Sequence, residues 1–172
     1  MEKNKKYILW FKEITKEDVP IVGGKNANLG EMYQNLISAK NATFTDETIQ
    51  VPYGFAVTAA AYNYFISANE LDKKIKDVLD KLDTDNIHAL EKAGQKVRDL
   101  IISAKFPQDL EEQILNSYTE LAKELNLDLS DLDVAVRSSA TAEDLPSASF
   151  AGQQETWGAR ASPTSSSFAN GP

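Results

Sequence analysis

The segment VAVRSSATAEDLPSASFAGQQET, residues Val134 to Thr156, decides how this chain is interpreted. It opens with a short apolar run that predicts a strand too apolar for a solvated edge, and the run ends at Arg137. Arginine offers a rigid fork of donors that matches phosphate oxygens, and the hydroxyl residues Ser138, Ser139 and Thr141 follow it. The segment therefore predicts a strand that leaves the core at Arg137 and continues into a loop able to hold a polyphosphate.

A purely structural interpretation of the same residues remains open. Arg137 could pair with Glu143 or Asp144, while Thr141 caps a short helix that has Asp144 at its third position. Both interpretations use the same spacing, so the sequence alone does not choose between them.

The polar stretch Gly152–Thr156 offers donors for a base, a ribose or a phosphate, and a surface hairpin is the alternative. Glu143, Asp144 and Glu155 carry carboxylates that could hold Mg²⁺, but their spacing matches no established ligand pattern. We therefore assign no metal ligand in this chain.

Lys25 is the second candidate for phosphate binding. Gly23 and Gly24 precede it and allow unusual backbone angles, and a helix is expected to begin just after it. Free N–H groups and the positive end of the helix dipole favour an anion at such a position. The segment is not a Walker A loop, which needs glycine in place of Val19 and Ser or Thr in place of Asn26. The alternative is a glycine turn that carries an exposed lysine.

Hydrophobic periodicity predicts an α+β chain that is mostly helical with a few short strands. Strands are expected at residues 7–11, 55–57 and 134–136, and a loop is expected at 38–50. Apolar residues recur at helical spacing over 29–37, 62–66, 71–82, 87–101 and 110–125, with Thr58 as the cap of the second helix and Pro107 near the start of the last.

Composition excludes several classes of function. The chain has 172 residues and a net charge of −8, which gives no general attraction to nucleic acid or to anionic membranes. The apolar run at 7–11 is too short for a signal peptide or a membrane span. Cysteine is absent, which fits a cytoplasmic location. The single histidine, His88, is expected at the surface, so neither a phosphate carrier nor a catalytic triad is indicated.

Three blocks together resemble one enzyme family. They are VGGKNANLGEM (Val22–Met32), VPYGFAVTAAAYNYF (Val51–Phe65) and the segment quoted first, and they are similar to the N-terminal part of the nucleotide-binding domain of phosphoenolpyruvate synthases, the pyruvate, water dikinases. Pyruvate, phosphate dikinase and rifampicin phosphotransferase share the blocks in altered form. Asn26 and the opening ILWF favour the synthases.

The resemblance implies an ATP-grasp-like domain over residues 1–157 and a set of site residues. Lys25 matches the lysine that contacts the nucleotide phosphates, and Arg137 matches the catalytic arginine that grips the transferring end of ATP. Gly152 and Thr156 match loop positions that lie against the nucleotide. The implied reaction is gluconeogenic. It converts ATP, pyruvate and water to phosphoenolpyruvate, AMP and phosphate with Mg²⁺, through a phosphohistidine on a mobile domain.

The family continues for several hundred residues, with the Mg²⁺ carboxylates, the phosphohistidine domain and the pyruvate-binding barrel beyond this point. Residues 158–172, GARASPTSSSFANGP, have no periodicity and are expected to be a disordered tail outside the family pattern. A fragment or a truncated reading frame, inactive alone and reaching pyruvate only through absent domains, is therefore expected. The alternatives are the lobe of a related dikinase or antibiotic phosphotransferase, and a non-catalytic nucleotide-binding module.

Overall fold

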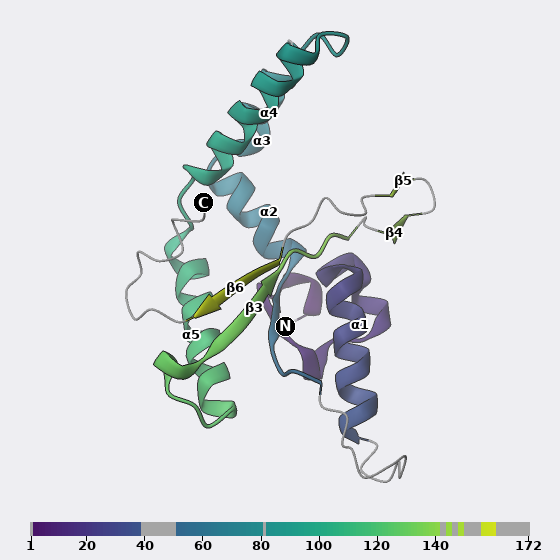
Figure 1. Cartoon of the computed structure of the whole chain (residues 1–172), viewed down its shortest axis with the longest axis vertical. Helices are drawn as coiled ribbons and strands as arrows, with labels where there is room; N and C mark the ends of the chain where they lie inside the picture. Colours follow the sequence, from purple (N-terminus) through teal and green to yellow (C-terminus); the bar gives the residue numbers. More distant parts are fainter. Residues whose placement is uncertain are drawn as a thin grey trace.

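The computed structural model describes residues 2–38, 51–80, 82–141, 144–145, 148–149 and 156–160. This part of the chain is mostly helical with short strands, which confirms the α+β class (Figure 1). Its helices are α1 (Val19–Ser38), α2 (Ala59–Ala68), α3 (Leu71–Leu79), α4 (Ile87–Ile102) and α5 (Gln108–Glu124). Its strands are β1 (Ile8–Trp10), β2 (Phe55–Val57), β3 (Asp133–Arg137), β4 (Asp144–Leu145), β5 (Ala148–Ser149) and β6 (Thr156–Arg160). They form antiparallel pairs, β1 with β2, β3 with β6 and β4 with β5.

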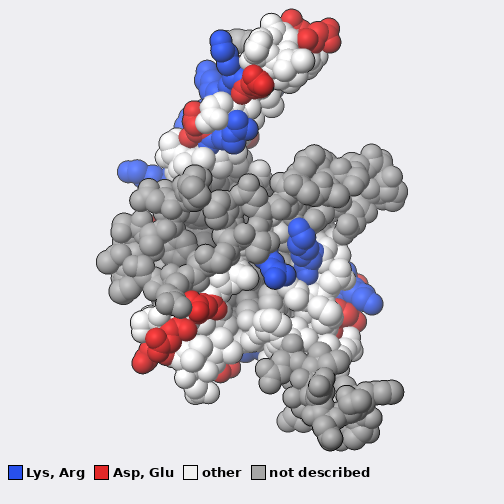
Figure 2. Space-filling view, viewed as in Figure 1, with Lys and Arg blue, Asp and Glu red and all other residues white. Residues whose placement is uncertain are grey.

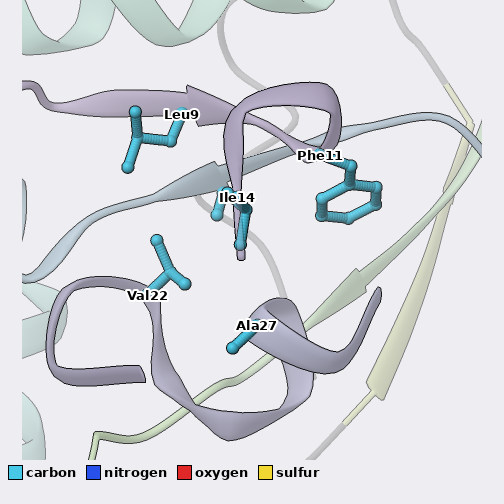
Figure 3. Packing of buried hydrophobic residues seen from close by; sticks show 6 residues of the cluster. Leu9, Phe11, Ile14, Val22 and Ala27 are labelled. Atoms are coloured by element: carbon cyan, nitrogen blue, oxygen red, sulfur yellow. The ribbon is translucent and has the colours of Figure 1, made fainter. Parts of the chain in front are cut away.

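The main core lies between the β1–β2 pair and α1. Strand β1 pairs with β2 in the register Ile8↔Val57 to Trp10↔Phe55. Both strands are short apolar runs, as the sequence predicted. Figure 3 shows buried side chains from this region pointing toward one another. The cluster consists of Leu9, Phe11, Ile14, Val22, Ala27 and Ala56. The apolar run that predicted the first strand therefore supplies the centre of the core.

Helix α1 begins earlier than its periodicity predicted and is broken near its start. Gly23, with φ 79° and ψ 161°, interrupts the helical backbone between two helical stretches. The buried face carries small residues such as Ala27 and Gly30, whereas Met32 is 45% exposed and Leu36 is 40% exposed. The expected apolar face is thus only partly buried, because close packing of the helix against Ile14 uses small side chains rather than large ones.

A buried carboxylate fixes the start of α1. Asp18 accepts hydrogen bonds from Lys3 Nζ at 2.7 Å and from the Thr15 backbone N–H at 2.8 Å. Burial alone would raise the pKa of the Asp18 carboxyl, but these hydrogen bonds outweigh it and the pKa lies below its ordinary value. The N-terminal segment is thereby tied to the first turn of α1.

A second core holds the base of β3. Leu121 and Ala122 of α5 pack with Leu132, which precedes β3, and all three are buried. Aromatic residues of the β1–β2 region, among them Trp10 and Tyr53, pack against the same cluster. Strand β3 is therefore anchored at its beginning by α5 and the first sheet.

Helices α3 and α4 pack on each other and project away from both cores (Figure 1). The predicted apolar face of α4 is accordingly mostly uncovered, and Ile87, Leu90 and Ile101 are exposed. His88 lies on this projection, as predicted for a surface histidine, with its side chain 90% exposed and its Nδ1 3.5 Å from Glu91. In the ranges given above, no helix has both the length and the apolar character that a bilayer span needs.

Candidate functional site

Two sequence motifs that lie far apart in the chain meet at the start of α1. The Ser139 hydroxyl donates a hydrogen bond of 2.9 Å to the Val22 carbonyl, across a separation of 117 residues. A Cβ at Gly23 would overlap Ser139 Oγ and would come within 2.9 Å of the Ala140 carbonyl oxygen. The glycine turn before Lys25 and the loop after Arg137 are therefore in direct contact.

The break in α1 explains why the Val22 carbonyl is available. Gly23 adopts a backbone conformation that L side chains rarely reach, which interrupts the helical hydrogen-bond pattern there. The Asn26 side chain donates a hydrogen bond of 2.9 Å to the same carbonyl. The carbonyl oxygen, which has two lone pairs, is thus satisfied by Asn26 from within α1 and by Ser139 from the loop after β3.

Strand β3 is more exposed than its apolar sequence predicted. It pairs with β6 in the register Asp133↔Arg160 to Arg137↔Thr156, and Val136 is 48% exposed. The expectation of a strand buried away from solvated edges is wrong, because the β3–β6 pair has little covering it within the described residues. The short-helix alternative also fails, since Asp144 lies in β4.

Lys25 and Arg137 are both exposed, and they belong to the two different segments that form this contact. Each lies two residues from a residue that forms it, so each Cα is within about 7 Å of the contact. Figure 2 shows Lys and Arg atoms on the face where Figure 1 places the start of α1 beside β3. The structure thus brings the backbone at the two cationic positions into one region of the surface.

The other two predicted site positions are placed in part. Thr156 is the first residue of β6 and pairs with Arg137 through the backbone, whereas Gly152 lies outside the described residues. Strand β6 continues to Arg160, so residues 158–160, which the sequence pattern assigned to a tail, form a ladder with β3. Strand β6 forms through backbone hydrogen bonds, which need no alternation of apolar and polar side chains. Hydrophobic periodicity therefore did not predict it.

Sequence reasoning misjudged one residue and missed the role of another. Ser139 was expected to offer its hydroxyl to a phosphate, but that hydroxyl is used by the Val22 carbonyl. Sequence reasoning used Asn26 only as a feature that favours the synthases. No local pattern indicated that its side chain donates a hydrogen bond to the Val22 carbonyl at the break in α1. Among the described residues, no group of three or more His, Cys, Asp or Glu side chains is arranged to hold a metal ion.

Comparison with known proteins identifies the class. Residues 19–160 match the family model described as pyruvate phosphate dikinase, AMP/ATP-binding domain. The chain belongs to this family, and the matched range includes both motifs that meet at Gly23 as well as β6.

Individual relatives within this family are phosphoenolpyruvate synthases by name. The chain is 49% identical over 157 residues to phosphoenolpyruvate synthase of Aquifex aeolicus, a match that covers 91% of this chain and 17% of that protein. It is 46% identical over 152 residues to the enzyme of the same name from Synechocystis, covering 87% and 18%. For the Escherichia coli enzyme of that name the identity is 44% over 150 residues, covering 87% and 17%. The chain therefore spans less than a fifth of the length of these relatives.

Proposed function

We propose that this chain is the part of a phosphoenolpyruvate synthase that binds the phosphates of ATP. In this proposal Lys25 and Arg137 hold the polyphosphate between them, and Gly152 and Thr156 lie against the nucleotide. The complete enzyme would convert ATP, pyruvate and water to phosphoenolpyruvate, AMP and phosphate, and pyruvate would bind to parts of the protein that this chain does not contain.

One observation carries the proposal, namely the contact of Gly23 with Ser139 and Ala140. It links the backbone that carries Lys25 to the backbone that carries Arg137, and both side chains are exposed to an incoming ligand. With a net charge of −8, the chain would otherwise repel a nucleotide, so a paired local cationic site is what ATP binding requires.

The two side chains suit different tasks. The guanidinium of Arg137 can donate two parallel hydrogen bonds to one phosphoryl group, which fixes its orientation. The ammonium of Lys25 is a compact charge on a flexible stem and can follow a phosphate oxygen as charge shifts during transfer. Phosphoryl transfer depends mainly on such positioned cations, so we assign Arg137 to the transferring end of ATP and Lys25 to the phosphate chain.

The finer features of the proposal rest on the resemblance. They are an ATP-grasp-like fold for the complete nucleotide-binding domain, a requirement for Mg²⁺, a cytoplasmic location and a role in gluconeogenesis. A metal ion would neutralise phosphate charge when bound. The described residues supply no group of ligands for it, and the proposal assigns it none in this chain.

The direct test is ATP binding by titration calorimetry in the presence of Mg²⁺, using the 172-residue chain and the variants Lys25→Ala and Arg137→Ala. Each variant loses charge-assisted hydrogen bonds to phosphate, so we expect each to raise the Kd for ATP by about 10- to 100-fold. Arg137→Lys keeps the charge but loses the fork and should bind with intermediate affinity. Matched controls are Lys92→Ala and Arg98→Ala on the projecting helix α4, which should leave the Kd unchanged.

The outcome is decisive when folding is monitored in parallel by circular dichroism. Saturable binding that both site variants weaken, and both controls preserve, supports the proposal. A cooperatively folded parent chain that binds no ATP would show that these residues do not form a nucleotide site by themselves. Equal loss of affinity in the controls would point to a non-specific effect of charge.

The acceptor substrate needs a separate test. A related dikinase or an antibiotic phosphotransferase would use the same cations for ATP, but the relatives found are named phosphoenolpyruvate synthases. We therefore propose pyruvate as the acceptor. A full-length protein that carries this lobe should release AMP and phosphate from ATP when pyruvate is added, and not when rifampicin is added.

A further inference from the structure

We propose that Ser139 is a positioning residue that sets the separation between Lys25 and Arg137. Its hydroxyl does not face a ligand, because it donates to the Val22 carbonyl on the other arm of the site. Where the inference concerns nucleotide binding, it rests on the function proposed above.

In α1, the Val22 carbonyl and the missing side chain of Gly23 together accommodate the Ser139 hydroxyl. The break at Gly23 frees the Val22 carbonyl from the regular helical pattern, and Asn26 takes up part of its hydrogen-bonding capacity. Gly23 has no side chain, and a Cβ there would come within 2.3 Å of Ser139 Oγ, which is too close. The backbone conformation of Gly23 thus makes the Val22 carbonyl available, and its missing side chain leaves room for Ser139. Lys25 follows two residues later.

The β3 side of the contact explains why positioning is needed. Strand β3 is anchored at its base, where Leu132 is buried against α5, but it is mostly exposed along its length up to Arg137. Pairing with β6 joins the two strands to each other up to Arg137, but a strand pair held at one end can swing at the other unless a contact outside the pair fixes it. Ser139 and Ala140 reach α1 just beyond Arg137 and provide that contact. The hydrogen bond of the Ser139 hydroxyl therefore restricts the position of the Arg137 backbone, from which the side chain extends.

The proposal predicts a geometric effect that does not depend on ATP. The chain contains no cysteine, so spin labels can be attached specifically to a Lys25→Cys, Arg137→Cys double variant. Dipolar broadening of the electron paramagnetic resonance spectrum then reports the distribution of distances between the two positions. With Ser139 present we expect a narrow distribution, and with Ser139→Ala added we expect a broad one.

Two further variants separate positioning from a general loss of stability. Ser117 is buried, and its hydroxyl, like that of Ser139, donates to a backbone carbonyl, that of Gln113 at 2.8 Å, but it lies in α5. Ser117→Ala should therefore leave the label distribution narrow. Ser139→Thr keeps the hydroxyl and should also leave it narrow. We expect Ser139→Ala to fold, because Asn26 still donates to the Val22 carbonyl.

Nucleotide affinity gives the second readout, measured on the same chains without labels. Ser139→Ala should raise the Kd for ATP by about fivefold, the equivalent of one neutral hydrogen bond, while Ser117→Ala leaves it unchanged. A narrow label distribution in folded Ser139→Ala would overturn the positioning role, whatever the affinity. If no chain binds ATP but the distribution broadens only without the hydroxyl, the positioning role is supported and the proposed nucleotide function fails on its own.

Discussion

Replacing Gly30 by alanine should destabilise this chain, although the same replacement normally stabilises a helix. Gly30 lies inside α1, and a Cβ there would come within 2.6 Å of both the Cβ and the carbonyl oxygen of Ile14. Favourable carbon contacts are about 3.5–4.0 Å, so the helix and Ile14 would have to separate by roughly 1 Å. Ile14 is fully buried and Gln34 Nε2 donates to its carbonyl, so that movement disturbs the main core.

The expected magnitude follows from two opposing effects. Alanine gains about 0.5–1 kcal/mol over glycine in a helix interior. Overpacking a well-filled core costs about 1–3 kcal/mol. The second effect is larger, so Gly30→Ala should lower the free energy of unfolding by about 1–2 kcal/mol.

Gly94 in α4 provides a matched control, because the nearest side-chain atom to its would-be Cβ is Arg98 Nη1 at an ordinary 3.5 Å. Gly94→Ala should therefore raise the free energy of unfolding by about 0.5–1 kcal/mol. Urea unfolding followed by circular dichroism measures both variants, with the slope against urea checked for constancy. If Gly30→Ala proved as stable as Gly94→Ala, the close packing of α1 on Ile14 would be refuted.

Substitutions at three other positions test separate parts of the fold by the same measurement. Asp18→Asn should lower the free energy of unfolding by about 1–2 kcal/mol at pH 7. Because the pKa of the Asp18 carboxyl is lowered in the folded chain, the difference should shrink as the pH falls below about 4, and a difference constant with pH would contradict this. Thr58→Ala removes the donor to the Lys6 carbonyl at 2.6 Å and the cap of α2, so it should cost about 1–2 kcal/mol, while Thr58→Ser should cost less. Leu132→Ala should cost about 2–5 kcal/mol by leaving a cavity against α5, and a cost below 1 kcal/mol would show that the base of β3 is not anchored there.

Local patterns in the sequence predicted the elements well where one residue decides the local geometry. Thr58 caps α2 by accepting from the Ala61 N–H, and Gly23 adopts the positive φ that a glycine turn suggested. Pro107 immediately precedes α5, as a residue with a fixed φ and no N–H can. These features depend on neighbours within a few residues, so the sequence contains all the information they need.

Features set by distant contacts were predicted less well. The buried face of α1 was misassigned at Met32 and Leu36, because periodicity counts large apolar residues and overlooks Gly30 packed against Ile14. The burial of β3 was overestimated, because an apolar strand does not reveal how many neighbours cover it. The hydrogen bond from Ser139 to Val22 was missed, because no local pattern joins residues 117 positions apart.

The register of β3 with β6 has a consequence for the order in which the site can form. A ribosome completes β1, β2 and all five described helices before residue 156 exists, so β3 has no strand to pair with until then. The contact between Ser139 and Val22 must also close a long stretch of chain, which is an entropically costly and slow kind of contact. The cores can therefore assemble around α1 and α5 first. The backbone at Arg137 acquires its ladder partner only when translation has passed Thr156, so the end of β3 that carries Arg137 forms late in folding.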